Sequence, residues 1–368
     1  MRSVEEIRPR PGLSVPVVTV LDAAGRLVED EQRAVVRHVV QDGQGADVVF
    51  AAGTTGEWHR IPPEESRRAI RVSVEEVAKR NAALGEAERG VEAWAGITAH
   101  TREETLENLD FALSSGADAA VLAPLSVRGL DDPVRFVARD VADLLDARPR
   151  RIPVFLYDNA DIAADPRVPH IRTRQVKALS RLDFVRGIKV SAPRKVLGNY
   201  TRAAANFRER GEFGIYVGDA MLIFEIFRPR DGWWGSAGQR WQRWRLAGGL
   251  PIGVVAGPAN ALPREWARAW QVCRAGDAER MERVRRVLER YRQATRGPGG
   301  KRSVACLKRA LRCLGVIRHD AVAEGTPPLS HEEASRFDEA FAEVRALSRE
   351  LLLPAWVSRG AGSAGASP

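Results

Sequence analysis

Lysine is rare in this chain of 368 residues, and one lysine stands where a nucleophile would be useful. Of the 57 lysine and arginine residues, only six are lysines. Lys189 lies in the segment GIKVS, at the end of an apolar run that predicts a β-strand. Arginine has no accessible neutral amine, whereas a desolvated lysine amine attacks carbonyl carbons. Lys189 therefore predicts a Schiff base, although a lone lysine at a strand end is more often a salt-bridge partner.

A tyrosine ends the preceding apolar run. Tyr157 begins the segment YDN, and a phenol serves as hydrogen-bond donor and acceptor in turn. Tyr157 is therefore a candidate for passing protons to and from a carbinolamine and a substrate hydroxyl. The plainer interpretation is a core aromatic residue with a solvated hydroxyl.

A third segment, GTTGE, follows the second apolar run. Thr54 and Thr55 offer backbone N–H groups and hydroxyls to a carboxylate, and Gly53 and Gly56 allow the backbone to approach a ligand closely. Such a turn is common and is weak evidence by itself.

Short β-branched, apolar runs alternate with longer segments of helical period, which is typical of βαβ units around a parallel sheet. Helix starts are predicted by Thr101 with Glu104, by Asp132 with Pro133, and by Thr173. Eight units over roughly 260 residues predict an α/β fold, a (β/α)8 TIM barrel, whose active site forms at the carboxyl ends of the strands. The predicted strands are Val15 to Val20, Asp47 to Ala51, Glu92 to Gly96, Ala119 to Ala123, Pro153 to Tyr157, Phe184 to Lys189, Phe213 to Val217 and Ile252 to Val255.

Three amphipathic segments follow the barrel, which predicts a C-terminal helical appendage: Asp277 to Arg292, Ser303 to Gly315 and Ser330 to Leu352. We expect an N-terminal extension at 1–11, the barrel at 12–276, the appendage at 277–355 and a disordered tail at 356–368. A Trp/Arg-rich insertion at 229–245 does not fit a minimal barrel. It is interpreted as a helical insertion that packs its indoles, with base stacking as the alternative.

Composition restricts the other function classes. The net charge is +9, but arginines alternate with acidic residues as on solvated helix faces, so we expect no nucleic-acid partner. The six histidines and three cysteines show no metal-ligand spacing, so no metal is expected. No apolar run of about 18 residues and no secretory signal occur, so we expect no membrane partner and a cytoplasmic protein.

Taken together, these segments resemble one known family. The set GTTGE, YDN, GIKVS and GVVAGPAN, in this order and spacing, is similar to that of the dihydrodipicolinate synthase / N-acetylneuraminate lyase family of class I aldolases. The resemblance spans roughly residues 12 to 350 and includes the appendage segment SVACLKRALRCLG.

The resemblance implies roles for particular residues. Lys189 would form the Schiff base, Tyr157 would relay protons, and Thr54 and Thr55 would bind the substrate carboxylate, with Gly53 in the same motif. The pocket would also be lined by Gly218 and Val255. Family members bind pyruvate or a substituted 2-oxo acid, use no metal or organic cofactor, and commonly form homotetramers, so we expect a dimer or tetramer.

The chain departs from the dihydrodipicolinate synthase pattern on the side of the second substrate. A TPYY-like motif after strand four is replaced by APLS, with Leu125 and Ser126 at the tyrosine positions. Ala160 replaces a proline, and Ile162 stands where an arginine would hold the second substrate's carboxylate. These changes argue against condensation of pyruvate with aspartate semialdehyde.

The leading expectation is a lyase that acts on pyruvate or a 2-oxo-3-deoxy acid by retro-aldol cleavage, aldol addition or dehydration. The first alternative is a 4-hydroxy-tetrahydrodipicolinate synthase with an altered second-substrate site. The second is a non-catalytic descendant that binds a metabolite or nucleic acid, against which the retention of both Lys189 and Tyr157 argues.

Overall fold

The computed structural model describes residues 8–83, 90–207, 212–228, 250–297 and 300–352. The predicted insertion at 229–245, the predicted tail at 356–368 and most of the N-terminal extension lie outside these residues.

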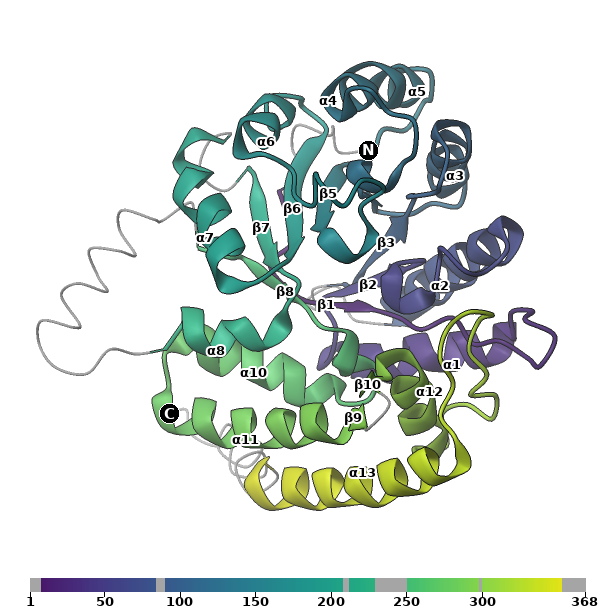
Figure 1. Ribbon diagram of the computed structural model, residues 1–368, viewed down its shortest axis with the longest axis vertical. Helices are drawn as coiled ribbons and strands as arrows, with labels where there is room; N and C mark the ends of the chain where they lie inside the picture. Colours follow the sequence, from purple (N-terminus) through teal and green to yellow (C-terminus); the bar gives the residue numbers. More distant parts are fainter. Residues whose placement is uncertain (1–7, 84–89, 208–211, 229–249, 298–299, 353–368) are drawn as a thin grey trace, which may run out of the picture.

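Eight parallel strands close into a barrel in chain order, with helices between them, which confirms the predicted (β/α)8 fold (Figure 1). The strands are β1 (Gly12–Pro16), β2 (Val48–Ala51), β3 (Glu92–Gly96), β4 (Ala119–Leu122), β5 (Val154–Asn159), β6 (Val185–Ser191), β7 (Gly214–Val217) and β8 (Gly253–Val255).

The first strand was predicted too late in the chain. It ends at Pro16 rather than Val20, although residues 17–20 are all buried. Side chains hold this segment in place of a strand ladder: Asn260 Oδ1 accepts from the Val18 N–H, and Gln32 Oε1 accepts from the Val20 N–H. Hydrophobicity reports burial, not strand pairing, so the apolar run extends beyond the strand.

Two helices around the barrel begin at the predicted capping residues. Thr101 Oγ1 accepts from the Glu104 N–H at 3.2 Å, and Asp132 Oδ1 accepts from the Val134 N–H at 2.8 Å. Thr173 is the first residue of its helix rather than the cap. The helices around the barrel are α1 (Glu29–Val40), α2 (Pro63–Ala83), α3 (Arg102–Ser114), α4 (Pro133–Phe136), α5 (Ala142–Asp146), α6 (Thr173–Leu179), α7 (Arg194–Ala203), α8 (Ile223–Ile226) and α10 (Pro263–Ala275).

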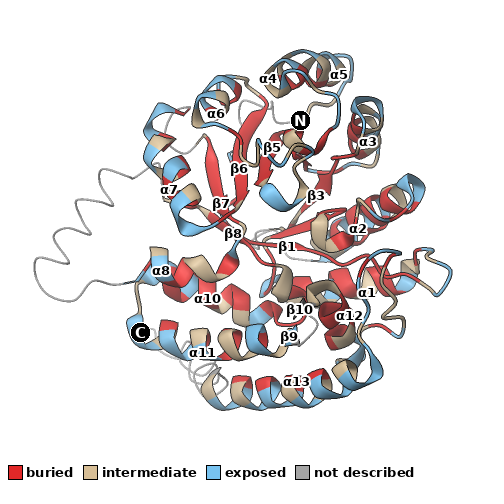
Figure 2. Ribbon diagram, viewed as in Figure 1, coloured by how far each residue is buried: buried red, intermediate tan, exposed pale blue. Residues whose placement is uncertain are grey.

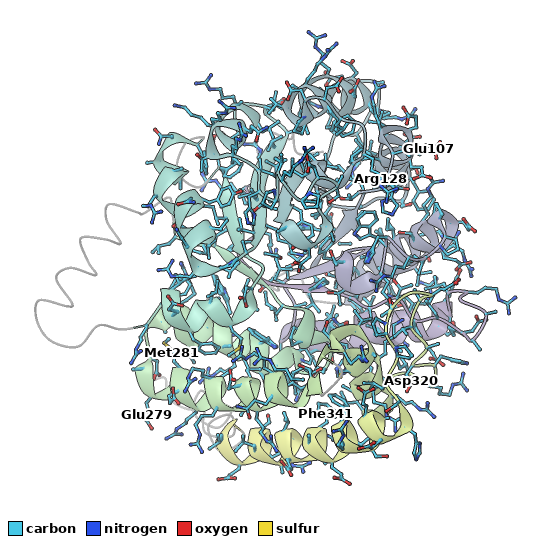
Figure 3. The ribbon with its side chains drawn as sticks, viewed as in Figure 1. Glu107, Arg128, Glu279, Met281, Asp320 and Phe341 are labelled. Carbon is cyan, nitrogen blue, oxygen red and sulfur yellow. The ribbon has the colours of Figure 1, made fainter. Side chains whose placement is uncertain are left out.

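The described residues after the barrel form three helices, α11 (Ala278–Ala294), α12 (Ser303–Cys313) and α13 (His331–Leu352). A two-stranded ribbon, β9 (Arg296–Gly297) and β10 (Gly300–Lys301), lies between the first two helices. In Figure 1 they lie along one side of the barrel, next to α8 and α10. Phe341 of α13 lies near α11, with its ring centroid 5.9 Å from that of Tyr291 (Figure 3). Glu31 of α1 accepts hydrogen bonds from the backbone N–H groups of Arg318 and His319, which attaches the appendage to the barrel.

Buried residues form two main clusters. The larger one lies between strands and surrounding helices, and the strands are buried except at Glu92, Asn159 and Ser191, which are partly exposed (Figure 2). The smaller one fills the barrel interior and contains Phe50, Phe155, Tyr157, Tyr216 and Val255. Among the described helices, none combines the length and apolar character needed to span a membrane.

Candidate active site

Two adjacent strands place four polar side chains together. In the register of β5 and β6, Tyr157 is paired with Lys189, and Asn159 is paired with Ser191. Side chains two residues apart on a strand share a face. Tyr157 belongs to the cluster inside the barrel, so all four side chains face the barrel interior near the carboxyl ends of the strands. The sixth strand was predicted to end at Lys189, but it continues to Ser191.

The Lys189 amine lies against aromatic rings. Its side chain is buried, with Nζ 3.8 Å from the ring centroid of Tyr157 and 5.1 Å from that of Phe50. No carboxylate in the described part of the chain forms an ion pair with it. This environment differs from that of the surface salt-bridge lysine that the sequence left open.

The Tyr157 hydroxyl is surrounded by hydrogen-bonding groups. Asn159 Nδ2 donates to it at 3.0 Å, and the hydroxyls of Thr54 and Ser191 lie 3.4 Å and 3.5 Å away. Burial by itself raises the pKa of the phenol, but the charge on Lys189 and these hydroxyls outweigh burial and hold the pKa of Tyr157 below its ordinary value. The phenol oxygen is therefore placed to hold negative charge.

The GTTGE segment forms a tight turn at the end of β2. Thr54–Gly56 is a single 3-10 turn, and Glu57 follows it with a φ of 61°, in the left-handed region. Gly53 is extended, and a Cβ there would lie 2.9 Å from the Phe50 ring. Packing against Phe50 therefore requires glycine at this position, a reason that the sequence did not indicate.

The two threonines of this turn face different neighbours. The Thr54 hydroxyl points at Tyr157 on β5. The Thr55 hydroxyl lies near Gly257, just after β8. A Cβ added at Gly257 would lie 3.3 Å from this hydroxyl. The pair therefore extends across the barrel mouth from β5 toward β8.

A buried ion pair holds the turn from behind. Glu57 Oε2 lies 2.7 Å from Lys308 Nζ of α12, and Glu57 Oε1 accepts from the Ala323 N–H at 3.0 Å. Lys308 also donates to the Ala321 carbonyl. The appendage thus supports the segment that carries Thr54 and Thr55, an arrangement that the sequence analysis missed.

The other predicted site residues lie close by. Gly218, just after β7, donates its N–H to the Val190 carbonyl at 2.7 Å, and a Cβ on it would lie 2.1 Å from Ser191 Oγ. Val255 on β8 belongs to the same interior cluster as Tyr157. Glycine at 218 therefore leaves the space that the Ser191 hydroxyl occupies.

The loops after β4 and β5 carry the residues at which the chain departs from the family pattern. The Ala164 N–H donates to the Leu125 carbonyl at 2.8 Å, which joins the two loops. Ile162 packs against the interior cluster that includes Tyr157. Ser126 is buried. The loops therefore present a hydrocarbon surface at residue 162.

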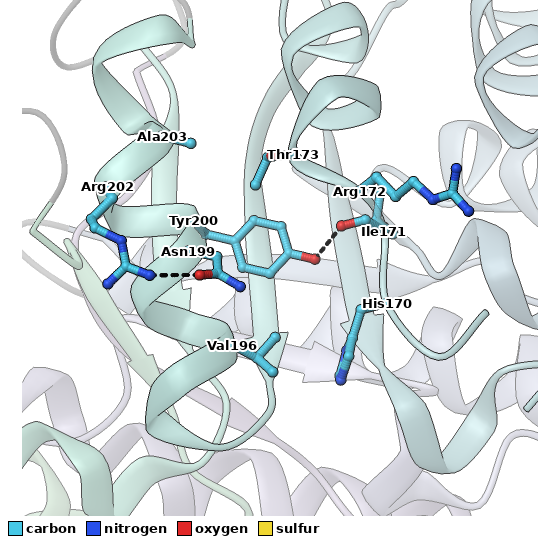
Figure 4. Close-up of a pocket in the computed structure, with 9 residues that line it drawn as sticks. All are labelled: His170, Ile171, Arg172, Thr173, Val196, Asn199, Tyr200, Arg202 and Ala203. Carbon is cyan, nitrogen blue, oxygen red and sulfur yellow. Dashed lines mark hydrogen bonds between the residues drawn. The ribbon is translucent and has the colours of Figure 1, made fainter. Parts of the chain in front are cut away.

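Asp158 faces away from this site. Its carboxylate accepts from the Ile171 N–H at 2.8 Å and bonds His170 Nδ1 at 2.9 Å. A surface cavity of about 580 Å³ lies here, lined by His170, Asn199 and Tyr200 among others, between the start of α6 and α7 (Figure 4). None of the predicted site residues lines it. Asp158 therefore anchors the loop that follows β5.

The chain is similar to several known proteins. A family model described as the dihydrodipicolinate synthetase family matches residues 10–127. A 4-hydroxy-tetrahydrodipicolinate synthase of Thermus thermophilus is 37% identical over 270 residues, which cover 72% of this chain and 74% of the relative.

Solved structures share the fold. A dihydrodipicolinate synthase from Bacteroides thetaiotaomicron has a TM-score of 0.72 at 20% identity, covering 92% of this chain and 99% of that one. YagE, a prophage protein of E. coli K12 solved in complex with pyruvate, has a TM-score of 0.69 at 19% identity, covering 91% and 98%. From the relative in Thermus and the family model, the chain belongs to the dihydrodipicolinate synthetase family.

Proposed function

We propose that this enzyme is a lyase that forms a Schiff base between Lys189 and the C2 carbonyl of pyruvate or a 2-oxo-3-deoxy acid. The observation that carries the proposal is the pairing of Lys189 with Tyr157: the buried amine lies 3.8 Å from the ring centroid of a phenol that three polar groups surround. A nucleophile and a proton-transfer group side by side, at the carboxyl end of a barrel, are what imine chemistry requires.

The first half of the reaction joins enzyme and substrate. The neutral Lys189 amine attacks C2, and Tyr157 transfers protons so that the carbinolamine loses water and leaves an iminium. The iminium nitrogen is bonded to C2 and carries the positive charge, which makes it an electron sink.

In cleavage, the Tyr157 phenolate takes the proton from the C4 hydroxyl while the C3–C4 bond breaks. The bonding electrons move into the new C2–C3 double bond of an enamine, and an aldehyde leaves. Protonation of the enamine at C3 and addition of water to C2 then release pyruvate and restore the amine. Aldol addition is the reverse sequence. In dehydration, a hydroxyl leaves as water instead of an aldehyde.

The substrate carboxylate belongs, in this proposal, on the turn at Thr54 and Thr55, with Gly53 before it. The turn lies next to Tyr157 through the Thr54 hydroxyl, and its hydroxyls and backbone N–H groups suit an anion. Gly218 and Val255 complete the wall beside the reacting carbons.

Borohydride trapping tests the proposal. The enzyme is incubated with pyruvate and borohydride, digested, and mapped by mass spectrometry. The reduced adduct is expected on Lys189 and on none of the other five lysines, and Lys189→Met should abolish it. Absence of an adduct on Lys189 in active protein would refute the imine mechanism.

A second candidate is 4-hydroxy-tetrahydrodipicolinate synthase, the enzyme of Thermus thermophilus to which this chain is 37% identical. Ile162 argues for a different partner aldehyde, because its side chain adds hydrocarbon to the interior cluster rather than charge. A coupled assay with pyruvate and aspartate semialdehyde separates the two candidates. Turnover comparable with that on 2-oxo-3-deoxy acids would favour the synthase.

Assembly and location complete the proposal. We place the enzyme in the cytoplasm as a homo-oligomer, a dimer or tetramer, with a small 2-oxo acid as its substrate and without a metal or organic cofactor. Light scattering on the purified protein measures the assembly directly.

A further inference from the structure

Among the described residues, Asn159 makes the shortest hydrogen bond to the proposed proton-transfer group. Its Nδ2 lies 3.0 Å from the Tyr157 hydroxyl oxygen, whereas the Thr54 and Ser191 hydroxyls lie 3.4 Å and 3.5 Å away. Asn159 reaches this oxygen because it stands two residues after Tyr157 on β5 and shares its face.

The orientation of the Asn159 amide is determined by its other contact. Asn159 caps the short turn Ala160–Ile162, and its Oδ1 accepts from the Asp161 N–H at 3.1 Å. A backbone N–H only donates, so the oxygen of the amide must face Asp161. The NH2 group must then face Tyr157, to which it can donate a hydrogen bond but from which it cannot accept one.

This donor constrains the phenol. Since Asn159 occupies one lone pair of the Tyr157 oxygen and Ser191 also donates to it, the phenol hydrogen must point elsewhere, toward Thr54 or a bound substrate. A donor also stabilises a phenolate more than a phenol, because hydrogen bonds to charged acceptors are stronger. A neighbouring hydroxyl need not constrain the phenol hydrogen or favour the phenolate, because it can rotate and accept a hydrogen bond from the phenol instead.

We propose that Asn159 is a positioning residue that keeps the Tyr157 oxygen ready to receive the substrate's hydroxyl proton. The inference rests on the proposed function for its place in the reaction. An amide cannot itself carry the proton, so Asn159 acts only through Tyr157.

Few other polar groups surround the phenol in the described residues, so the effect of Asn159 can be distinguished from that of its neighbours. The charged group that faces Tyr157 is Lys189 of β6, the turn after β2 contributes the uncharged Thr54, and the interior cluster offers apolar side chains apart from Tyr216. The Tyr216 hydroxyl donates to the Arg10 carbonyl. Lys189 supplies the charge next to the phenol, and Asn159 supplies its shortest hydrogen bond, so the two contributions can be removed one at a time.

The chain has four tyrosines, and the other three are unfavourable to ionise. Burial raises the pKa values of Tyr200, Tyr216 and Tyr291. The tyrosinate absorbance in the near ultraviolet should therefore report Tyr157 first as the pH rises. Tyr157→Phe, which should lose this first step, assigns it.

The test variant is Asn159→Asp. Aspartate keeps an oxygen for the Asp161 N–H and is a good N-cap, but it replaces the donor beside Tyr157 with a charged acceptor. The first tyrosinate step should move upward by about one pH unit or more, and the limb of the kcat/KM pH profile that reports the base should move with it. Asn159→Ser, which retains a cap oxygen but is too short to reach the phenol, should shift both in the same direction by less.

A first tyrosinate step that stays at its original pH in both variants would overturn the inference. So would a step that moves while the kcat/KM profile does not, because Asn159 would then act on Tyr157 without serving the reaction. Borohydride trapping on Lys189 fails independently if the proposed function is wrong, since neither the titration nor the Asn159 contact enters it.

Discussion

The carboxylate of Glu57 lies 2.7 Å from the ammonium of Lys308, and both side chains are almost completely buried. Glu57 ends the turn that carries Thr54 and Thr55, while Lys308 belongs to the appendage helix α12. The pair therefore connects the proposed carboxylate site to the C-terminal helical appendage.

We expect Lys308→Met to lower the free energy of unfolding by about 3–5 kcal/mol, because it leaves the Glu57 carboxylate buried without its partner. The KM for the 2-oxo acid should also rise, because the turn loses its support. Urea unfolding and steady-state kinetics measure the two effects. Arg285→Met, which removes an exposed ion pair with Glu282, is the matched control and should change little.

The double variant Glu57→Gln/Lys308→Met separates charge from packing. It should be more stable than Lys308→Met alone, because no unpaired charge remains. Equal loss in both proteins would mean that the ion pair is not the cause.

Gly218→Ala should lower kcat by about tenfold or more, because a Cβ at this position would lie 2.1 Å from Ser191 Oγ and would displace a neighbour of Tyr157. Overpacking should also cost about 1–3 kcal/mol of stability. Gly198→Ala is the control: its Cβ would meet only the end of the Arg202 side chain, and alanine favours the helix. A variant at 218 with unchanged kcat would contradict the close packing.

Substitution of Thr54 and of Thr55 should change different kinetic constants. Thr54→Val removes the hydroxyl 3.4 Å from the Tyr157 oxygen, so kcat should fall by about tenfold. Thr55→Val removes a hydroxyl on the β8 side of the turn, so KM should rise by about tenfold with little change in kcat. Steady-state kinetics on one 2-oxo acid measures both, and identical effects on kcat would argue against separate roles.

Glu31 should make stability depend on acidic pH. Burial raises the pKa of its carboxyl, but hydrogen bonds from the backbone and side chains of His319 and Arg318 outweigh burial and lower the pKa to about 2 from its ordinary 4.5. Because the folded-state pKa is the lower one, the stabilisation is present above about pH 4.5 and is lost as the pH falls toward 2. It amounts to less than roughly 3 kcal/mol at neutral pH, because water screens the Arg318 side chain, which is 87% exposed.

Glu31→Gln should therefore be less stable than the parent protein at pH 7, and the difference should shrink at pH 3. Urea unfolding at both pH values measures it. A difference that is independent of pH would show that the contact contributes through shape rather than charge.

The barrel could be predicted because buried parallel strands leave continuous apolar runs, and all eight were found. Errors arose where burial and pairing diverge, as at residues 17–20, which are buried without being in a strand. Within the site, Tyr157, Lys189 and Thr54 were identified and do lie together.

Asn159 and Ser191 were missed, although the strand period of two places each on the face of a predicted residue. The strand period therefore indicated both residues. The pairing of Glu57 with Lys308 is different in kind, because it joins residues 251 positions apart. No local sequence pattern predicts a contact over that separation. The contact of Gly53 with Phe50 spans only three positions, but the sequence does not show which way the Phe50 ring turns.

The pairing of Tyr157 with Lys189 through the strand register has a consequence for evolution and engineering. Main-chain hydrogen bonds between neighbouring strands set their separation near 4.8 Å, so the distance between the two groups is inherited from the barrel and not from the connecting segments. Residues 163–169, which lie between the turn that orients Asn159 and the contacts to Asp158, are then free to be exchanged. New aldehydes should be accommodated by grafting that stretch from a relative, with the imine-forming apparatus left untouched.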